Sequence, residues 1–149
     1  MDQCATHYPV FLDLRGRRVV VIGGGPVAVR KAKGLLEAGA VVTVIAPELV
    51  TGLAVQQKVR KYRSGDLKGA VLAFTATNDR AVNAQVTAEA NKRRIPVNVA
   101  DAPDEGDFIV PARVRRGRIQ IAISTGGESP RLAKQLREKL ESVLPDVRT

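Results

Sequence analysis

Four apolar residues followed at once by three glycines most restrict what this chain can fold into. Residues 19–28 read VVVIGGGPVA, and the residues that follow have a helical pattern. A run of four apolar residues has no polar side, which is typical of a strand buried on both faces. Glycines let the chain turn sharply at the end of such a strand. The segment therefore predicts a buried strand, a tight turn and a helix in direct succession.

The alternation of strands and helices continues to about residue 112. The apolar runs predict strands at 17–22, 41–45, 71–75 and 96–99, with a weaker candidate at 59–63. One helix is expected over 27–38, ending before Gly39, and another after Asn78 or Asp79 as its N-cap. Strands that alternate with helices form parallel sheets with right-handed crossovers. We therefore expect an α/β fold, a Rossmann-like doubly wound parallel sheet, over residues 1–112.

Residues 113–149 are expected to form a separate small segment of strands and one helix. Two short strand patterns at 108–114 and 118–124 flank the turn Arg115-Arg116-Gly117, which predicts a hairpin. Ser129-Pro130 then supplies an N-cap and a first-turn proline for a final helix. A hairpin and one helix bury little apolar surface alone. We therefore expect this segment to pair with a second copy of the chain in a homodimer.

Composition narrows the class of protein. The chain has one cysteine and one histidine, so we expect neither a disulfide nor a metal site. It has no apolar run of the roughly 20 residues that span a membrane and no signal-peptide pattern, so we expect a cytoplasmic protein without a membrane partner.

The formal net charge of +9 indicates either a solvated basic surface or an anionic partner. Nucleic-acid binding is disfavoured, because the basic residues near 113–118 are accompanied by few aromatic side chains.

The glycine turn has the pattern of a dinucleotide site. Gly23, Gly25 and Ala28 form G-x-G-x-x-A between a strand and a helix. In such a motif the first glycine makes the turn, the second lets a diphosphate approach the backbone, and the small third residue permits close packing. The diphosphate binds at the helix N-terminus. A tight turn without a ligand is the alternative interpretation.

The expected acidic residue at the end of the second strand is replaced by Ile45-Ala46-Pro47-Glu48. Either Glu48 or the backbone near Pro47 is then expected to contact the ribose. Because no arginine stands there to bind a 2′-phosphate, we expect NAD rather than NADP.

Several longer motifs resemble one family over nearly the whole chain. These are the stretch Tyr8-Pro9-Val10-Phe11-Leu12, the glycine segment, and the sequences TATND, NVADAP, DFIVPA and IAISTGGESPRLAKQLREKLE. In this order they resemble the precorrin-2 dehydrogenase module of siroheme synthases. The resemblance implies NAD-dependent oxidation of precorrin-2 to sirohydrochlorin on the route to sirohaem. In some members it also implies insertion of ferrous iron.

The resemblance also implies roles for individual residues. The catalytic aspartate of the family corresponds to Asp101, which from its position alone is either a general base or a loop residue that caps a turn. The implied cofactor contacts are Gly23, Gly25, Pro26, Val27, Ala28, Pro47, Glu48, Thr75, Ala76 and Thr77.

Precorrin-2 carries eight carboxylates, which accounts for the excess of positive charge. The substrate contacts that we expect are Asn98, Arg113, Arg116, Thr125, Gly126 and Arg131.

Some features depart from the family pattern. Thr125 stands where many members have a serine, and the sequence ends where longer relatives continue into a C-terminal helical domain. Two other function classes therefore stay open: a non-catalytic module that senses NAD, and a basic protein associated with nucleic acid.

Overall fold

The computed structural model describes residues 7–48 and 50–145, which form two compact units. The larger unit spans Phe11–Ile109, and the described part of the smaller one consists of residues 7–10 and 110–145. The expected boundary after residue 112 lies three residues beyond this division.

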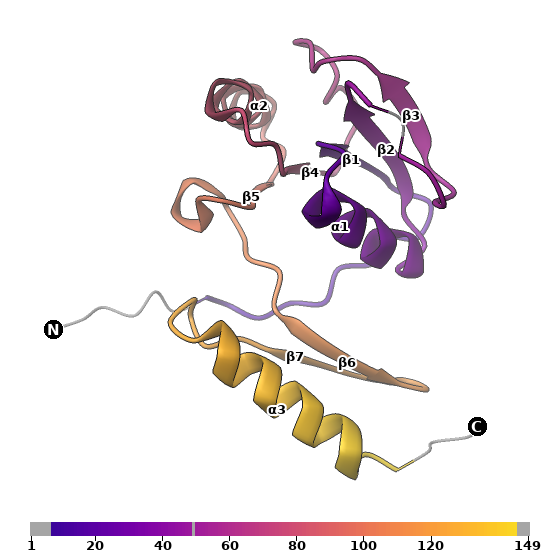
Figure 1. Cartoon of the computed structure of the whole chain (residues 1–149), viewed down its shortest axis with the longest axis vertical. Helices are drawn as coiled ribbons and strands as arrows, with labels where there is room; N and C mark the ends of the chain where they lie inside the picture. The colour runs from indigo at the N-terminus through magenta and orange to yellow at the C-terminus, as the bar shows by residue number, and fades with distance from the viewer. Residues whose placement is uncertain (1–6, 49, 146–149) are drawn as a thin grey trace, which may run out of the picture. The chain divides into compact units, whose positions relative to one another are not determined.

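A five-stranded parallel sheet forms the centre of the larger unit (Figure 1). The order of its strands is β3-β2-β1-β4-β5, so the chain builds one half of the sheet outward from β1 and then returns to build the other half. The point where the strand order reverses lies between β1 and β4. This arrangement confirms the predicted Rossmann-like fold. The strands are β1 (Arg18–Ile22), β2 (Val41–Ala46), β3 (Gln56–Val59), β4 (Leu72–Thr75) and β5 (Val97–Val99).

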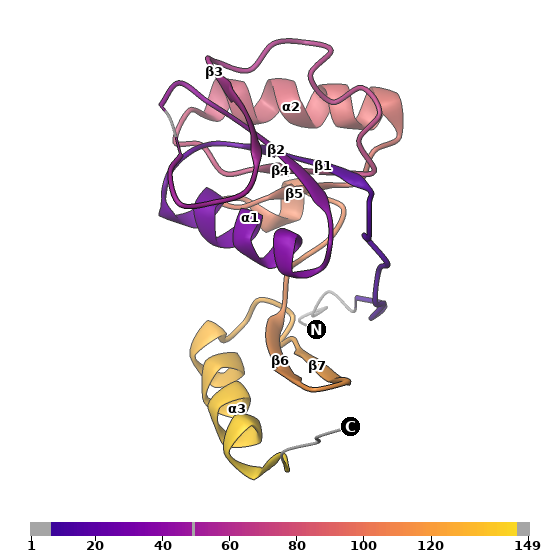
Figure 2. The ribbon, with the colours of Figure 1, turned by 90° about the vertical axis from the view of Figure 1, so that its right-hand side faces the viewer.

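Two helices cover the two faces of this sheet. Figure 2 shows α1 (Pro26–Glu37) and α2 (Arg80–Arg93) on opposite sides of the strands. Alternate residues of the strands point to the two helices, so Val19 and Val21 pack in the α1 layer while Val20 and Ile22 pack in the α2 layer. The apolar run that predicted a strand buried on both faces therefore fills two separate cores.

The edge strand β3 differs from the prediction. The sequence pattern favoured residues 59–63, whereas Gln56–Val59 pairs with β2. An edge strand has a neighbour on one side only, and β3 is polar and largely exposed, so its apolar pattern is weak. In the smaller unit, the hairpin strands β6 (Ala112–Arg116) and β7 (Ile119–Ile123) are followed by α3 (Pro130–Val143).

The predicted hairpin turn Arg115-Arg116-Gly117 was wrong, because both arginines belong to β6 and the turn consists of Gly117 and Arg118. Gly117 has a φ of 58°, as a tight two-residue hairpin turn requires. Within the described ranges, no helix is long and apolar enough to cross a bilayer.

A buried carboxylate organises the connection from β3 to β4, which contains no helix among its described residues. Asp66 is 6 % exposed and binds Lys58 at 2.9 Å, Arg60 at 2.7 Å and the backbone N–H of Arg63 at 2.9 Å. The hydrogen bonds from Arg60 lower the pKa of Asp66 against the opposing effect of burial, and Lys58 and the Arg63 N–H lower it further. Asp66 therefore ties the end of β3 to the turn that leads into β4.

We expect the Asp66→Asn substitution to lower the free energy of unfolding by about 2 kcal/mol, because it leaves the Arg60 guanidinium without its partner. The lowered pKa means that Asp66 stabilises the fold above its ordinary titration range near pH 4 and loses this effect as the pH falls through its folded value. Urea unfolding at pH 7 and at pH 3 measures both effects. Asp13→Asn, at an exposed ion pair with Arg15, is the control and is expected to leave stability unchanged. Equal effects of the two substitutions would contradict this role for Asp66.

Candidate active site

The carboxyl ends of the central strands lie side by side and form the edge where the candidate site is built. The N–H of Gly23 donates to the carbonyl of Ile45 at 2.9 Å, and that of Ala76 donates to Ile22 at 2.8 Å. The N–H of Ala100 donates to Thr75 at 3.0 Å. These bonds continue the sheet beyond its strands and bring the segments after β1, β4 and β5 together. Ligands of doubly wound sheets bind at this edge, near the reversal of strand order.

The glycine loop has the shape that a diphosphate needs. Gly23 has a φ of 127°, and a Cβ added to it would lie 2.4 Å from the carbonyl oxygen of Ala76. A Cβ on Gly25, in contrast, would meet no atom of the described chain within 4 Å. The first glycine is therefore needed for close packing inside the protein, and the second leaves open space beside the backbone.

The N-terminus of α1 adds an attraction for anions. The helix begins at Pro26 with Gly25 as its N-cap, and within the described structure no side chain caps it. Its first turn contains no acidic residue. The N–H groups of this turn and the positive end of the helix dipole are then directed at the open space beside Gly25. These residues fit the diphosphate of a dinucleotide.

The end of β2 supplies the next part of the site. A Cβ on Gly24 would lie 3.0 Å from the Cβ of Ala46, so the glycine loop packs directly against the end of β2. Pro47 and Glu48 follow and are exposed. Residues 47–53, which follow this strand, include no lysine or arginine that could bind a 2′-phosphate.

The last residue of β4 points its side chain inward, and the two residues after it lie toward the edge. Thr75 is fully buried and donates its hydroxyl to the Oδ1 atom of Asn83 on α2. Ala76 and Thr77 are half-buried, and the Thr77 hydroxyl lies 2.7 Å from the same oxygen of Asn83. Of the three residues expected to face the nicotinamide, Thr75 thus has its side chain occupied inside the protein.

Asp101 lies two residues after β5 and is held by side chains of α2. Its Oδ1 atom accepts a hydrogen bond from Asn83 at 3.3 Å, and its Oδ2 atom pairs with Arg80 at 3.2 Å. Arg80 also pairs with Glu105, which lies in the short 3-10 helix Pro103–Glu105. The side chain of Asp101 is 43 % exposed, so a ligand at this edge has access to it. Neither Arg80 nor Asn83 was identified from the sequence.

Asn98 lies on the other face of the sheet. Its carbonyl oxygen accepts from the ammonium of Lys31 on α1 at 2.9 Å, and its amide donates to the carbonyl of Phe108 at 2.9 Å. Lys31 also lies 5.6 Å from the ring centre of Phe74, and burial, followed by repulsion from Arg30, lowers its pKa. The amide of Asn98 is 5 % exposed and holds α1, β5 and the loop after it together.

The remaining expected substrate residues belong to the smaller unit. Arg113 on β6 and Arg131 on α3 are exposed. Arg116 donates to the carbonyls of Glu141 and Leu144, at the C-terminal end of α3. The hydroxyl of Thr125 accepts from the N–H of Ser129, and Gly126 has a φ of 67° in the turn before α3. Their roles toward a substrate stay predictions.

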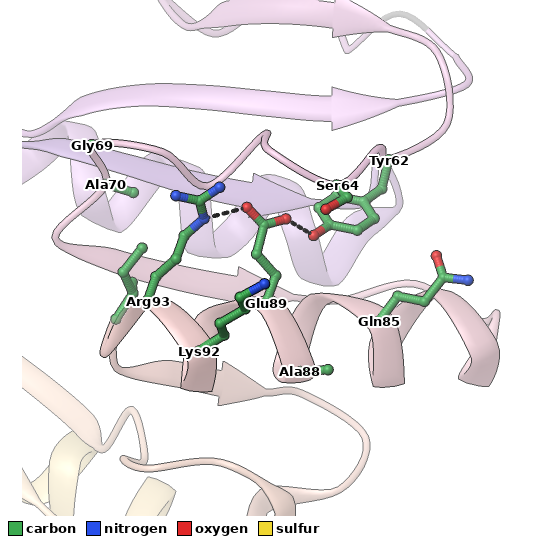
Figure 3. A pocket seen from close by; sticks show the side chains of 10 residues that line it. Tyr62, Ser64, Gly69, Ala70, Gln85, Ala88, Glu89, Lys92 and Arg93 are labelled. Atoms are coloured by element: carbon green, nitrogen blue, oxygen red, sulfur yellow. Dashed lines mark hydrogen bonds and ion pairs between the residues drawn. The ribbon is translucent and has the colours of Figure 1, made fainter.

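A depression of about 790 Å³ lies between α2 and the connection from β3 to β4 (Figure 3). Glu89 of α2 lies at its centre, bonded to Tyr62 on one side and to Arg93 on the other (Figure 3). Burial alone would raise the pKa of Glu89, but the hydrogen bonds from Tyr62, Gly65 and Arg93 lower it below its ordinary value. Its lining residues include neither the glycine loop nor Asp101, so the depression is separate from the candidate site.

The described residues contain no group of three side chains suited to hold a metal ion. Insertion of iron therefore stays a prediction from the resemblance.

Two family models match the chain. Residues 10–112 match a family described as putative NAD(P)-binding, and residues 116–142 match the central part of sirohaem biosynthesis proteins. The siroheme synthase of Pseudomonas fluorescens SBW25 is 46 % identical over 92 % of this chain and 31 % of its own length. That of Methylococcus capsulatus is 45 % identical over 93 % of this chain and 31 % of its own length.

The chain thus spans about a third of the length of these curated relatives. Among solved structures, SirC, a precorrin-2 dehydrogenase, superposes with a TM-score of 0.80. It is 38 % identical, and the match covers 94 % of this chain and 72 % of SirC. Together with the matched residues 10–112, these similarities show that the chain belongs to the NAD(P)-binding family of precorrin-2 dehydrogenases and siroheme synthase N-terminal modules.

Proposed function

We propose that the chain is an NAD-dependent dehydrogenase that oxidises precorrin-2 to sirohydrochlorin. The observation that carries this proposal is the position of Asp101, a reachable carboxylate at the same sheet edge as the open glycine loop. The oxidation removes two electrons and two protons from the substrate. NAD, when bound, accepts a hydride, and the second proton needs a base.

The residues of the chain perform the other tasks. The N–H groups at the start of α1 bind the diphosphate, and the space beside Gly25 lets it approach the backbone. Glu48 or the backbone at Pro47 contacts the ribose, which favours NAD over NADP. The Oδ2 atom of Asp101 takes the proton, after Arg80 has moved to a carboxylate of the incoming substrate.

Basic residues of the smaller unit bind carboxylates of the substrate in this proposal. Arg113 and Arg131 are exposed and suited to bind carboxylates. The turn at Thr125 and Gly126 is a further carboxylate contact, while Asn98 and Arg116 act mainly through the backbone and side chains that they hold in place. Location in the cytoplasm stays a prediction from the sequence, which shows neither a membrane-spanning apolar run nor a signal-peptide pattern.

The active form in this proposal is a homodimer. Leu132, Leu136 and Val143 of α3 are 46 %, 39 % and 66 % exposed, which leaves an apolar surface on a unit with little core of its own. Sedimentation equilibrium is expected to give twice the mass of the chain. Leu136→Lys is expected to shift this mass toward that of the monomer, and a monomeric wild-type protein would contradict the proposal.

The two glycines give a paired test of coenzyme binding. We expect Gly25→Ala to keep the melting temperature and to weaken NAD binding at least about tenfold, because its methyl group fills space outside the folded chain. Gly23→Ala is expected to destabilise the protein itself, because its Cβ collides with the Ala76 carbonyl.

Thermal melts with and without NAD measure both effects. NADP should stabilise the wild type less than NAD. Full protection of Gly25→Ala by NAD, or stronger protection of the wild type by NADP, would contradict this assignment.

Asp101→Asn tests the proposed base. The amide cannot accept a proton, so the rate of NADH formation from precorrin-2 should fall about 10²- to 10⁴-fold while NAD affinity is retained. The reaction is followed by NADH absorbance and by the spectrum of the macrocycle. Asp104→Asn, an exposed acid of the neighbouring 3-10 helix, is the control. Unchanged turnover of Asp101→Asn would refute the proposal. NAD binding without turnover in the wild type would favour a non-catalytic module that senses NAD. Salt-sensitive binding of nucleic acid in preference to the tetrapyrrole would favour a basic protein associated with nucleic acid.

A further inference from the structure

Asn83 joins the segment after β4 to the proposed base. This residue belongs to α2 and is 1 % exposed, although its side chain is polar. Its carbonyl oxygen Oδ1 accepts hydrogen bonds from the hydroxyls of Thr75 and Thr77. Its amide nitrogen Nδ2 donates to the carbonyl of Thr77 at 3.1 Å and to Oδ1 of Asp101 at 3.3 Å. One buried amide therefore contacts both strand ends of the candidate site.

These four partners fix the orientation of the amide. Two hydroxyl groups face its oxygen, while a carbonyl and a carboxylate, which can only accept, face its nitrogen. Turning the amide over would set oxygen against oxygen on one side. The fixed orientation presents an N–H to Asp101, and that N–H stays in place because the other three bonds hold the group.

The two oxygens of Asp101 are consequently in different situations. Oδ1 is bound by Asn83, which is buried, whereas Oδ2 is bound by Arg80, whose side chain is 52 % exposed. An exposed arginine exchanges partners readily, while a buried and fully bonded amide does not. We infer that Asn83 is a positioning residue that anchors Asp101 through Oδ1, so that Oδ2 is the atom that receives the proton. This inference rests on the proposed function.

A purely structural role would involve the threonines alone. The hydroxyls of Thr75 and Thr77 bind the oxygen of Asn83, whereas its nitrogen binds Asp101 and the backbone carbonyl of Thr77. Asn83→Asp keeps the accepting oxygen for both hydroxyls and removes the N–H groups that face Asp101 and the Thr77 carbonyl, so the effect on Asp101 itself is read from the pH profile. The charged groups near Asp101 are Arg80 on α2 and, through Arg80, Glu105 on the 3-10 helix. Both are unchanged in this variant.

The test compares Asn83→Asp with Asn91→Asp, the same change at an exposed position near the other end of α2. For Asn83→Asp we expect kcat to fall about 10- to 100-fold, with KM for precorrin-2 and NAD within about twofold of the wild type. Two carboxylates at this distance resist joint ionisation, so the acidic limb of the kcat profile should move to higher pH. Asn91→Asp should behave as the wild type. Equal kinetics and equal pH profiles of the two variants would overturn the inference.

A second measurement needs neither turnover nor a destabilised variant. In the full wild-type chain, the ¹⁵N and ¹H resonances of the Asn83 side-chain amide should shift as Asp101 titrates, and in Asp101→Asn this shift should vanish. If the wild type fails to oxidise precorrin-2 but this shift is observed, the proposed function fails while the anchoring contact stands. If the resonances of the Asn83 side-chain amide do not change as Asp101 titrates, the anchoring contact between the two residues is refuted.

Discussion

The close approach of Gly23 to the carbonyl of Ala76 is the contact on which the rest of the site depends. It requires both the absence of a side chain and a φ of 127°, and it brings the turn after β1 directly over the end of β4. Because β4 and β5 are neighbours in the sheet and Asp101 follows β5, this contact also places the glycine turn on the same side of the sheet as Asp101. If the glycine loop lay further from the sheet, the nicotinamide ring of a bound coenzyme would not lie beside the carboxylate of Asp101. The geometry of the loop and the chemistry of the edge are thus coupled through the backbone.

Buried apolar strands and their turns were predictable, because their signals are local. The run at 19–22 and the glycines after it indicate a strand and a turn whatever surrounds them, and Asp79 indicates a helix start by its own side chain, which accepts from Ala81 and Val82. The edge strand β3 was misplaced because its position is set by pairing with β2 and not by an apolar pattern of its own. The hairpin turn was misplaced by two residues for the same reason, since Arg115 and Arg116 read as turn residues but pair with β7.

The residues around the candidate base could not be predicted in the same way. Asp101 was singled out by the family resemblance, and its position at the end of the predicted fifth strand agreed with that role. Asn83 could have been noticed in the sequence, because it lies three residues before Val86 on the buried side of α2. A polar side chain that is buried there must have hydrogen-bond partners. Its partners, however, come from β4 and from the segment after β5, and only the folded chain brings these together. Lys31 and Asn98 are a similar pair, separated by 67 positions in the chain.

Polar bonds at two separate points of α2, Asn83 and Glu89, have a consequence for how this helix can move. Asn83 binds the carboxyl edge of the sheet, and Glu89, almost two turns later, binds Tyr62 and Gly65 in the connection from β3 to β4. Apolar contacts tolerate small sliding and rotation, but hydrogen bonds to fixed partners are directional. A helix attached at one such point can pivot, and a helix attached at two cannot. Adjustment of this unit to a large ligand must then come from the loops and from α1, while α2 supplies a frame of constant geometry.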